Sequence, residues 1–560
     1  MFGVHAAAWH GWGGMWRFVA LDLIHPPLFY AVLKVWAGAF GAGSVWWLRM
    51  LPVVASVMAI FPVVMLAREL RLGARTIGLA LVLAAVSGTL IKYAQEVRMY
   101  SPLLLFAACS LWLFARYCNS SAADARRGAV ALFVANLLLV YTHYFGWLVV
   151  ALEVVYVAAF ARAKLKLFAA SFVALAGCFV PWVWAVWRAA SGAGGGLEQN
   201  LGWAARPAWR ELFEPYLALH EPFRARQQSN EPAVLGVDLA LAVLIFAPPL
   251  AALCWRALAR RTNRDDPVSA NRDDSVGARQ VSADDANKAN VDDANKASAD
   301  DANEGRGAVA FLVFFAFAPA VVAFALAQVL PQSVWGARHL IVVAPAYLLL
   351  AAHALESFRP RWLSVTLKLL LGCWLALACV VAVARRPPVP VWCAWEPLAL
   401  QAARDEKTEA ARDEKREAAR DERAAAGVTA RDAAPAADPT RDAGAAIKIY
   451  AFEDLVAYQL WYALSARGEK GLSVAVVRDA PGVLDDRAFF LPRGFADVSV
   501  ETVDAAMRED EFWVALRGAG PDDENAVLKL LRGRGYEAGR RFEFAGEGQK
   551  AFVLLMRRRP

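Results

Sequence analysis

The chain has 560 residues, of which 58% are hydrophobic, including 21 Trp and 30 Phe. This composition is far from that of a soluble globular protein and is typical of an integral membrane protein. The formal net charge of +7 arises from Lys and Arg clusters between apolar runs, so it indicates no nucleic-acid partner.

Ten apolar runs, with their aromatic and small polar ends, are long enough to cross a bilayer as helices. They are residues 51–66, 77–91, 99–115, 128–140, 146–161, 167–187, 234–253, 309–330, 340–354 and 363–384. Basic connections alternate with connections that carry few cations, which places the basic ones in the cytoplasm. We therefore expect an all-α polytopic membrane protein with about ten transmembrane helices.

The first 50 residues are expected to form juxtamembrane helices outside the membrane. Tryptophans recur there at helical spacing, at Trp9, Trp12 and Trp16, which predicts a helix in the interface plane. Pro26 and Pro27 then fix an extended corner before a second helix. Asp22 and His25 stand just ahead of this corner, either as a cap and an interfacial histidine or as functional groups.

The stretch KYAQEVRMYS, residues 92–101, sets Glu96 and Arg98 between two apolar runs. A charged side chain at mid-bilayer costs about 2.5–3.5 kcal/mol on insertion scales. The two charges should therefore lie in a turn at the membrane surface or face a watery cavity. A wet turn with a simple Glu and Arg pair and a functional site are both compatible with this pattern.

Further polar residues are expected on the same outer side. The stretch YTHYFGW, residues 141–147, places Tyr141, His143 and Tyr144 between two spans. An aromatic belt explains the tyrosines but explains His143 less well. Arg338 stands at the outer mouth of a later span, where it can snorkel or bind a phosphate. Residues 189–232 form a long Gly-rich loop, typical of a mobile segment over a site.

The spans fall in residues 51–259 and 307–384, separated by an octapeptide array at 260–306 that we expect to be a disordered cytoplasmic loop. Its paired aspartates lack the glycine of a calcium loop, so no metal site is expected there. A Pro-rich and charged-repeat linker is predicted at 385–446. Residues 447–560 alternate like strands and helices, which predicts a small extracytoplasmic α/β domain.

The outer side thus collects carboxylates, cations and hydroxyls: Asp22, His25, Glu96, Arg98, Tyr100, His143 and Arg338. One candidate chemistry for such a set at a membrane surface is the transfer of a sugar from a polyprenyl phosphate. The leaving phosphate needs cations more than a strong acid, and the acceptor hydroxyl needs a carboxylate base. Arginine can bind two phosphate oxygens at once.

Three ordered blocks resemble one family: HPPLFYAVLKVWAGAFG followed by WWLRMLPVVAS, then YAQEVRMYSPLLL, then YTHYFGW. They are similar to blocks of the bacterial integral-membrane glycosyltransferases of the C-type fold, which are related to protein O-mannosyltransferases and to the aminoarabinose transferase of lipid A. The resemblance covers roughly residues 9–161 well and the later spans more loosely. It implies inverting transfer at the outer face of the bacterial inner membrane, from a polyprenyl-phosphate sugar to a glycan, lipid A or protein.

By this resemblance Glu96 and Asp22 are the candidate catalytic carboxylates. The candidate donor-phosphate ligands are His25, Arg98 and Arg338, and further substrate contacts are expected at Gln95, Tyr100, Tyr141, His143 and Tyr144. No residue is assigned to a metal, although a divalent metal ion assists some members of the family.

One departure from the family concerns its usual catalytic base. Members begin with a first helix and a loop with an aromatic-Asp-Glu motif, whereas this sequence begins just after that point. We expect the true start to lie upstream; alternatively, Asp22 or Glu96 acts as the base. Two other functions stay open: a transporter in which Glu96 and Arg98 form an intramembrane ion pair, and an inactive member that acts in assembly or binding.

Overall fold

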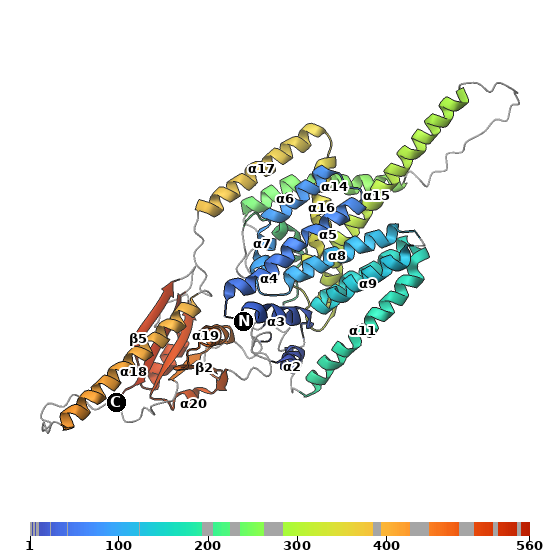
Figure 1. Ribbon diagram of the computed structural model, residues 1–560. Coiled ribbons are helices and arrows are strands. Elements are labelled where there is room, and N and C mark those ends of the chain that lie inside the picture. Colours follow the sequence, from blue (N-terminus) through green and yellow to red (C-terminus); the bar gives the residue numbers. More distant parts are fainter. Residues whose placement is uncertain are drawn as a thin grey trace.

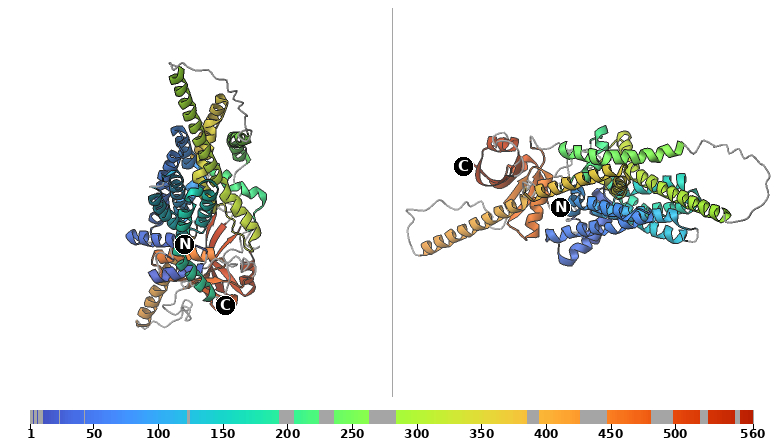
Figure 2. Two further views of the ribbon diagram at one scale, coloured as in Figure 1. Left: turned by 90° about the vertical axis from the view of Figure 1, so that its right-hand side faces the viewer. Right: turned by 90° about the horizontal axis from the view of Figure 1, so that it is seen from above.

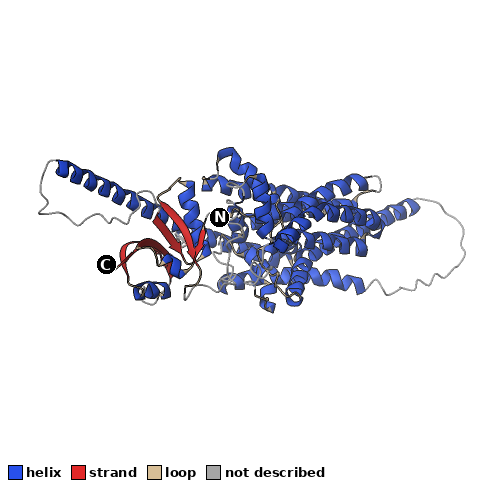
Figure 3. Cartoon of the chain, turned by 90° about the horizontal axis from the view of Figure 1, so that it is seen from below, coloured by secondary structure: helices blue, strands red, loops and turns tan. Residues whose placement is uncertain are grey.

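The computed structural model describes residues 3, 6, 11–22, 24–41, 43–121, 124–192, 205–223, 236–262, 284–384, 394–425, 447–480, 498–518, 525–545 and 550–559. The described residues form a bundle of helices with a small sheet domain at one end (Figures 1 and 3). We call this the domain end of the bundle. The first part of α15 (Asp284–Val329) projects from the opposite end (Figure 2).

Eight helical stretches in the described chain are long and apolar enough to cross a membrane: Val45–Glu69, Tyr100–Asn119, Ala125–Thr142, Arg162–Ser191, Val237–Trp255, Gly307–Val329, His339–Ser357 and Arg361–Ala384. Two shorter apolar helices, α6 (Ala74–Val86) and α10 (Phe145–Phe160), fill the remaining two expected runs. The prediction of an all-α polytopic membrane fold is therefore confirmed.

Besides α6, α10 and α15, the bundle contains these elements: α4 (Val45–Met58), α5 (Ile60–Glu69), α8 (Tyr100–Asn119), α9 (Ala125–Thr142), α11 (Leu165–Gly192), α14 (Gly236–Thr262), α16 (Ala344–Ser357) and α17 (Arg361–Ala384). Two helices precede it, α2 (Trp12–Asp22) and α3 (Leu28–Phe40), at the domain end (Figure 1). Both helices fall within residues 1–50, the expected juxtamembrane region, and α4 also begins within that range, at Val45. Trp9 lies outside the described residues.

The run at 77–91 is not one helix. Ser87 takes an extended conformation, and its hydroxyl accepts a hydrogen bond from the Leu90 N–H at 3.5 Å, so α6 ends there and α7 (Gly88–Gln95) begins. The Gly88 N–H donates to the Glu221 carbonyl at 2.8 Å. The break is therefore braced by the long loop.

The described part of the 189–232 loop, residues 205–223, is anchored to the bundle rather than mobile. Its helix α13 (Glu214–His220) ends beside α16, where His220 Nε2 lies 2.8 Å from the Tyr347 hydroxyl. The Tyr216 hydroxyl donates to the Ala316 carbonyl at 2.9 Å. The glycine run of this loop lies outside the described residues.

Two repeat arrays are more helical than expected. Residues 284–306 form the first turns of α15 rather than a disordered loop; residues 263–283 lie outside the described chain. Helix propagation from an apolar span avoids the cost of a new nucleus. In the predicted linker, α18 (Trp395–Ala425) packs on the sheet domain and buries Trp395 and Leu398. Its first turns belong to that domain.

The sheet has the strand order β3-β2-β1-β4-β6-β5. Its strands are β1 (Ile447–Ala451), β2 (Leu472–Val477), β3 (Ser499–Glu501), β4 (Glu511–Gly518), β5 (Tyr536–Ala545) and β6 (Lys550–Arg558). The first four pair in parallel, while β6 is antiparallel to both β4 and β5. Alternate side chains face two separate apolar cores. Helices α18 and α19 (Asp454–Ala466) cover one face, and α20 (Val503–Ala506) and α21 (Ala526–Gly533) cover the other.

A closed polar ring ties α8, α9 and α10 together inside the bundle. Ser110 Oγ lies 2.7 Å from Asn136 Oδ1 and 2.6 Å from Glu153 Oε1, and Asn136 Nδ2 donates to Glu153 Oε2 at 2.7 Å. Glu153 and Ser110 are 0% exposed. The ring closes without an unsatisfied atom when the Glu153 carboxyl carries a proton and donates it to Ser110, which donates in turn to Asn136.

We expect Glu153→Gln to fold normally, because the amide can both donate to Ser110 and accept from Asn136. Glu153→Leu should unfold more readily, because it leaves buried polar groups unsatisfied at a cost of about 1–3 kcal/mol. Thermal unfolding in detergent, followed by size-exclusion chromatography, compares the two variants. Equal loss of stability in both would contradict the protonated ring.

Candidate active site

Four turns at the domain end bring polar residues together. They are the α2–α3 corner, the α7–α8 turn, the α9–α10 turn, and the segment ahead of α16. The His25 and His143 rings lie with their centroids 6.2 Å apart, and those of His143 and His339 lie 4.8 Å apart. Segments separated by more than 300 residues thus meet at one place.

Asp22 and His25 form a buried pair at the α2–α3 corner. Asp22 Oδ2 lies 2.5 Å from His25 Nδ1, and both residues are 8% exposed. A carboxylate oxygen and an imidazole nitrogen at this separation form a short, strong hydrogen bond. Pro26 and Pro27 prevent α2 from continuing and so hold the pair in the corner. This contact leaves His25 Nε2 for other partners.

His143 is held neutral. Burial, together with the charges on His25 and Arg338, lowers the pKa of His143 to about 3. Its Nδ1 accepts a hydrogen bond from the Phe145 N–H at 3.1 Å, so the proton of the neutral ring is on Nε2. The ring therefore offers one N–H donor to the site.

Two cations, Arg98 and Arg338, belong to the site. Tyr30, Tyr100 and Asp22 all lie within electrostatic range of the Arg98 guanidinium. Arg338 lies within electrostatic range of His143. The two arginines thus bring two guanidinium groups from distant turns to the same cluster of histidines and tyrosines.

Glu96 is the second carboxylate. It follows α7 directly, it is half-buried, and it lies within electrostatic range of Arg98. Its carboxylate forms no hydrogen bond or ion pair with another described residue. The simple paired turn is therefore absent here, and the lone pairs of Glu96 stay available.

Three residues predicted to contact the substrate, Tyr141, Tyr144 and Gln95, are not part of this histidine and arginine cluster. The Tyr141 hydroxyl donates to the Cys178 carbonyl at 2.6 Å, and the Tyr144 hydroxyl accepts from Trp182 Nε1 at 3.0 Å. Both tyrosines thus hold α11 against the α9–α10 turn. Gln95 is exposed at the end of α7. Among the predicted substrate contacts, Tyr100 and His143 lie in the cluster.

Tyr30 and His339 join the site although neither was predicted. The Tyr30 ring centroid lies 6.4 Å from that of His25, and burial together with the Asp22 charge raises the pKa of Tyr30 so that it stays protonated. His339 Nδ1 is buried without a hydrogen-bond partner. His339 could have been predicted from the sequence, because it directly follows Arg338, a predicted phosphate ligand. Tyr30 could not, because it is one of several aromatic residues in an apolar helix.

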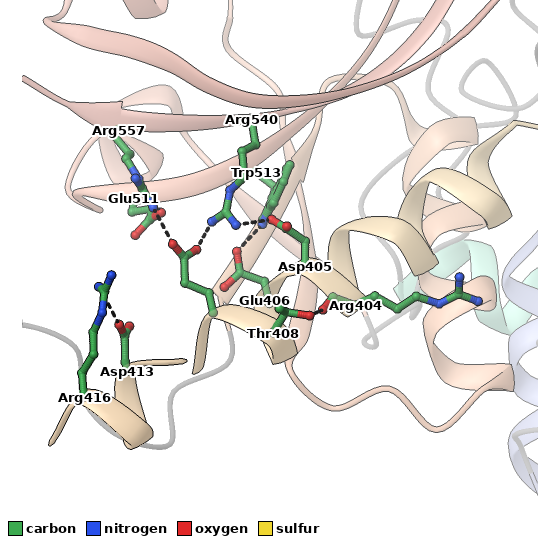
Figure 4. A network of polar contacts seen from close by, with 11 residues as sticks. Arg404, Asp405, Glu406, Thr408, Asp413, Arg416, Glu511, Trp513, Arg540 and Arg557 are labelled. Carbon is green, nitrogen blue, oxygen red and sulfur yellow. Dashed lines mark hydrogen bonds and ion pairs between the residues drawn. The ribbon is translucent and has the colours of Figure 1, made fainter. Parts of the chain in front are cut away.

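Three carboxylates whose oxygens converge, as a metal site requires, occur in the described chain at Asp405, Glu406 and Glu409 of α18. Arg540 and Trp513 already engage them (Figure 4). Arg540 contacts Asp405 at 2.7 Å and also Glu409, and Glu406 accepts from Trp513 Nε1 at 2.7 Å. We therefore assign this cluster to the packing of α18 on the sheet.

No family model matches the chain, and no match was found among curated proteins. Two solved structures are similar to it. The crystal structure of ArnT from Cupriavidus metallidurans in the apo state has a TM-score of 0.48 and 16% identity, covering 99% of this chain and 93% of that one. The same protein bound to undecaprenyl phosphate has a TM-score of 0.47 and 16% identity, covering 95% and 88%. At such identity the function must be argued from the residues of the site.

Gly146 makes the turn that carries His143 possible. A Cβ added to Gly146 would lie 2.8 Å from the carbonyl oxygen of Leu139 in α9, a backbone atom that cannot move aside. We expect Gly146→Ala to displace His143 and to weaken activity at least tenfold without removing any polar group. Gly177→Ala in α11 is the matched control, since its added Cβ meets nothing within 4 Å. Equal activity of the two variants would contradict this role.

Proposed function

We propose that the protein is a membrane glycosyltransferase that moves a sugar from a polyprenyl-phosphate donor to an acceptor hydroxyl. The observation that carries this proposal is the convergence of Arg98 and Arg338 with the Asp22 and His25 pair at the domain end. Two guanidinium groups near a lipid surface suit a phosphate joined to a lipid chain. We place this end on the extracytoplasmic face of the bacterial inner membrane.

In the proposed reaction the acceptor oxygen attacks the anomeric carbon from the side opposite the phosphate. The new bond from acceptor oxygen to carbon forms as the bond from carbon to phosphate oxygen breaks, so the configuration inverts. The electron pair of the broken bond stays on the phosphate, where Arg98 and Arg338 stabilise it. The proton of the acceptor hydroxyl passes to a carboxylate.

Glu96 is our candidate for this base, because its carboxylate is half-buried and makes no hydrogen bond or ion pair with a described residue. Asp22 is engaged by His25, which suits it to orient that histidine toward the phosphate. The donor phosphate would then meet His25, His143, Arg98 and Arg338. The structures of ArnT include one with undecaprenyl phosphate, and we take this lipid as the probe for binding.

We expect Arg98→Gln and Arg338→Gln each to weaken undecaprenyl phosphate binding about tenfold or more, since a hydrogen bond to a charged group contributes about 1.5–3 kcal/mol. Titration of the purified protein, read by intrinsic tryptophan fluorescence, measures the dissociation constants. Arg188→Gln is the control: it removes the same charge from an exposed arginine that stacks on Trp184 in α11. Unchanged binding in both site variants would refute the proposed donor site.

Glu96→Gln should keep undecaprenyl phosphate binding and lose transfer. Transfer is followed by mass spectrometry as undecaprenyl phosphate released from a panel of undecaprenyl-phosphate sugars in the presence of cell-envelope extract. The loss should exceed about 100-fold, as expected for removal of a general base. Full transfer by Glu96→Gln would move the base role to Asp22, which Asp22→Asn then tests.

A further inference from the structure

The short helix α7 leads directly to Glu96 (Figure 1). It runs over eight residues from Gly88 to Gln95, and Glu96 is the next residue. At a rise of about 1.5 Å per residue, Glu96 lies about 12 Å along the chain from the break at which α7 begins. A change in the direction of α7 therefore displaces the Glu96 carboxylate.

The first end of α7 is held by residues 214–223, which we call the anchored segment. A break between two helices leaves backbone groups without intrahelical partners, and the serine at this break is 0% exposed. The anchored segment supplies partners on both sides. The Gly88 N–H donates to the Glu221 carbonyl at 2.8 Å, which serves the start of α7. The Phe223 N–H donates to the Val86 carbonyl at 2.7 Å, which serves the end of α6.

A side chain of α7 adds a third hydrogen bond to the anchored segment. Thr89 Oγ1 donates to the Ala218 carbonyl at 2.9 Å. At the end of the segment, Phe223 has a φ of 57°, in the left-handed region that a residue with a side chain rarely adopts. Such a conformation persists only where the surrounding contacts hold it. The junction between the segment and α7 is therefore a defined contact.

The anchored segment is itself fixed to three helices of the bundle. The Tyr216 hydroxyl donates to the Ala316 carbonyl of α15 at 2.9 Å. His220 Nε2 lies 2.8 Å from the Tyr347 hydroxyl of α16. The His220 ring also stacks on Phe246 of α14, with the ring centroids 3.8 Å apart. The segment thus gives α7 a rigid support.

The second end of α7 is held by α8. Ser101, in the first turn of α8, is 1% exposed, and its hydroxyl donates to the Tyr93 carbonyl at 2.9 Å. The rings of Tyr93 and Tyr100 pack against each other, with their centroids 4.8 Å apart. One hydroxyl near each end, Thr89 and Ser101, therefore ties α7 to its surroundings.

Glu96 and Arg98 are attached to different helices, although they lie in the same turn. Glu96 is the C-cap residue of α7. Arg98 directly precedes Met99, the N-cap residue of α8, which is 1% exposed. A displacement of α7 should therefore move the carboxylate more than the guanidinium.

We infer that Thr89 and Ser101 are positioning residues that hold α7, and through α7 the Glu96 carboxylate, where it can take the proton of the acceptor hydroxyl. The inference rests on the proposed function. It predicts that loss of either hydroxyl slows transfer and leaves undecaprenyl phosphate binding unchanged, because the arginines proposed to bind phosphate are attached to α8 and to the segment ahead of α16.

Thr89→Val keeps the shape of the side chain and removes its donor. At saturating donor lipid we expect the rate of undecaprenyl phosphate release to fall about tenfold or more, since a small displacement of a catalytic group is costly. The dissociation constant of undecaprenyl phosphate should not change. Thr89→Ser keeps the hydroxyl and should restore the rate. Thr366→Val is the control, because that hydroxyl donates to a carbonyl of its own helix, α17.

Ser101→Ala should show the same separation of rate from binding. Its matched control is Ser364→Ala, which removes another buried hydroxyl that donates to a carbonyl of the preceding helix, that of Leu355 at 2.6 Å. Ser364 joins α17 to α16 and has no contact with α7, so its loss should leave the rate unchanged. Thr89 and Ser101 lie near opposite ends of α7, and either variant tests the inference if the other fails to fold.

Hydrogen exchange of residues 90–97, read by mass spectrometry, follows α7 without any substrate. Exchange should be faster in Thr89→Val and Ser101→Ala and unchanged in both controls. Full transfer by these two variants, or equal losses of transfer and binding, would overturn the inference. An equal loss of transfer in Ser364→Ala would also overturn it, because it would show a general loss of stability. If the unmodified protein neither binds undecaprenyl phosphate nor releases it, the proposed function fails instead.

Discussion

The site depends on the hydrogen bond between Asp22 and His25. Both side chains are buried, and neither could be buried alone without a large desolvation cost. Their 2.5 Å contact allows the α2–α3 corner to be packed against the α9–α10 turn, and the corner prolines prevent relaxation into a longer helix. The surrounding turns can therefore approach one fixed pair rather than a flexible loop.

The groups around this pair include permanent cations, a neutral histidine and carboxylates. Arg98 and Arg338 supply fixed positive charge, while His143 stays neutral and offers a donor. The carboxylates Asp22 and Glu96 lie within range of the same arginine. A region of this kind can bind an anion and still hold a base next to it, because the arginines do not lose their protons. This combination suits the proposed sugar transfer from a phosphate donor better than a simple structural ion pair, in which opposite charges satisfy each other.

The sequence was most informative where the chain meets the membrane. The lengths of the ten apolar runs predict the helices of the bundle. A polar residue that an aromatic belt or a helix cap does not readily explain, such as His25 or His143, indicates the turns that form the candidate site. Tyr30 was missed because an aromatic residue in an apolar helix carries no such signal. The break at Ser87 is braced by a segment more than 130 residues away. The acidic face of α18 packs on the sheet because Arg540 pairs with Asp405 and Trp513 donates a hydrogen bond to Glu406. Long-range contacts of this kind cannot be deduced from local composition.

The charged array on α18 helps to place the sheet domain next to the candidate site. Glu406 is 7% exposed and accepts from Trp513 on β4, which sets α18 on the same sheet face that carries α19 (Figure 4). α19 in turn ends at Ala466, whose carbonyl oxygen lies beside Gly43 in the turn between α3 and α4. The buried side chains of α18 and α19 belong to the same apolar core as those of α2 and α3. A segment that resembles a spacer in composition thus helps to form the face of the sheet domain that packs against the helices of the candidate site.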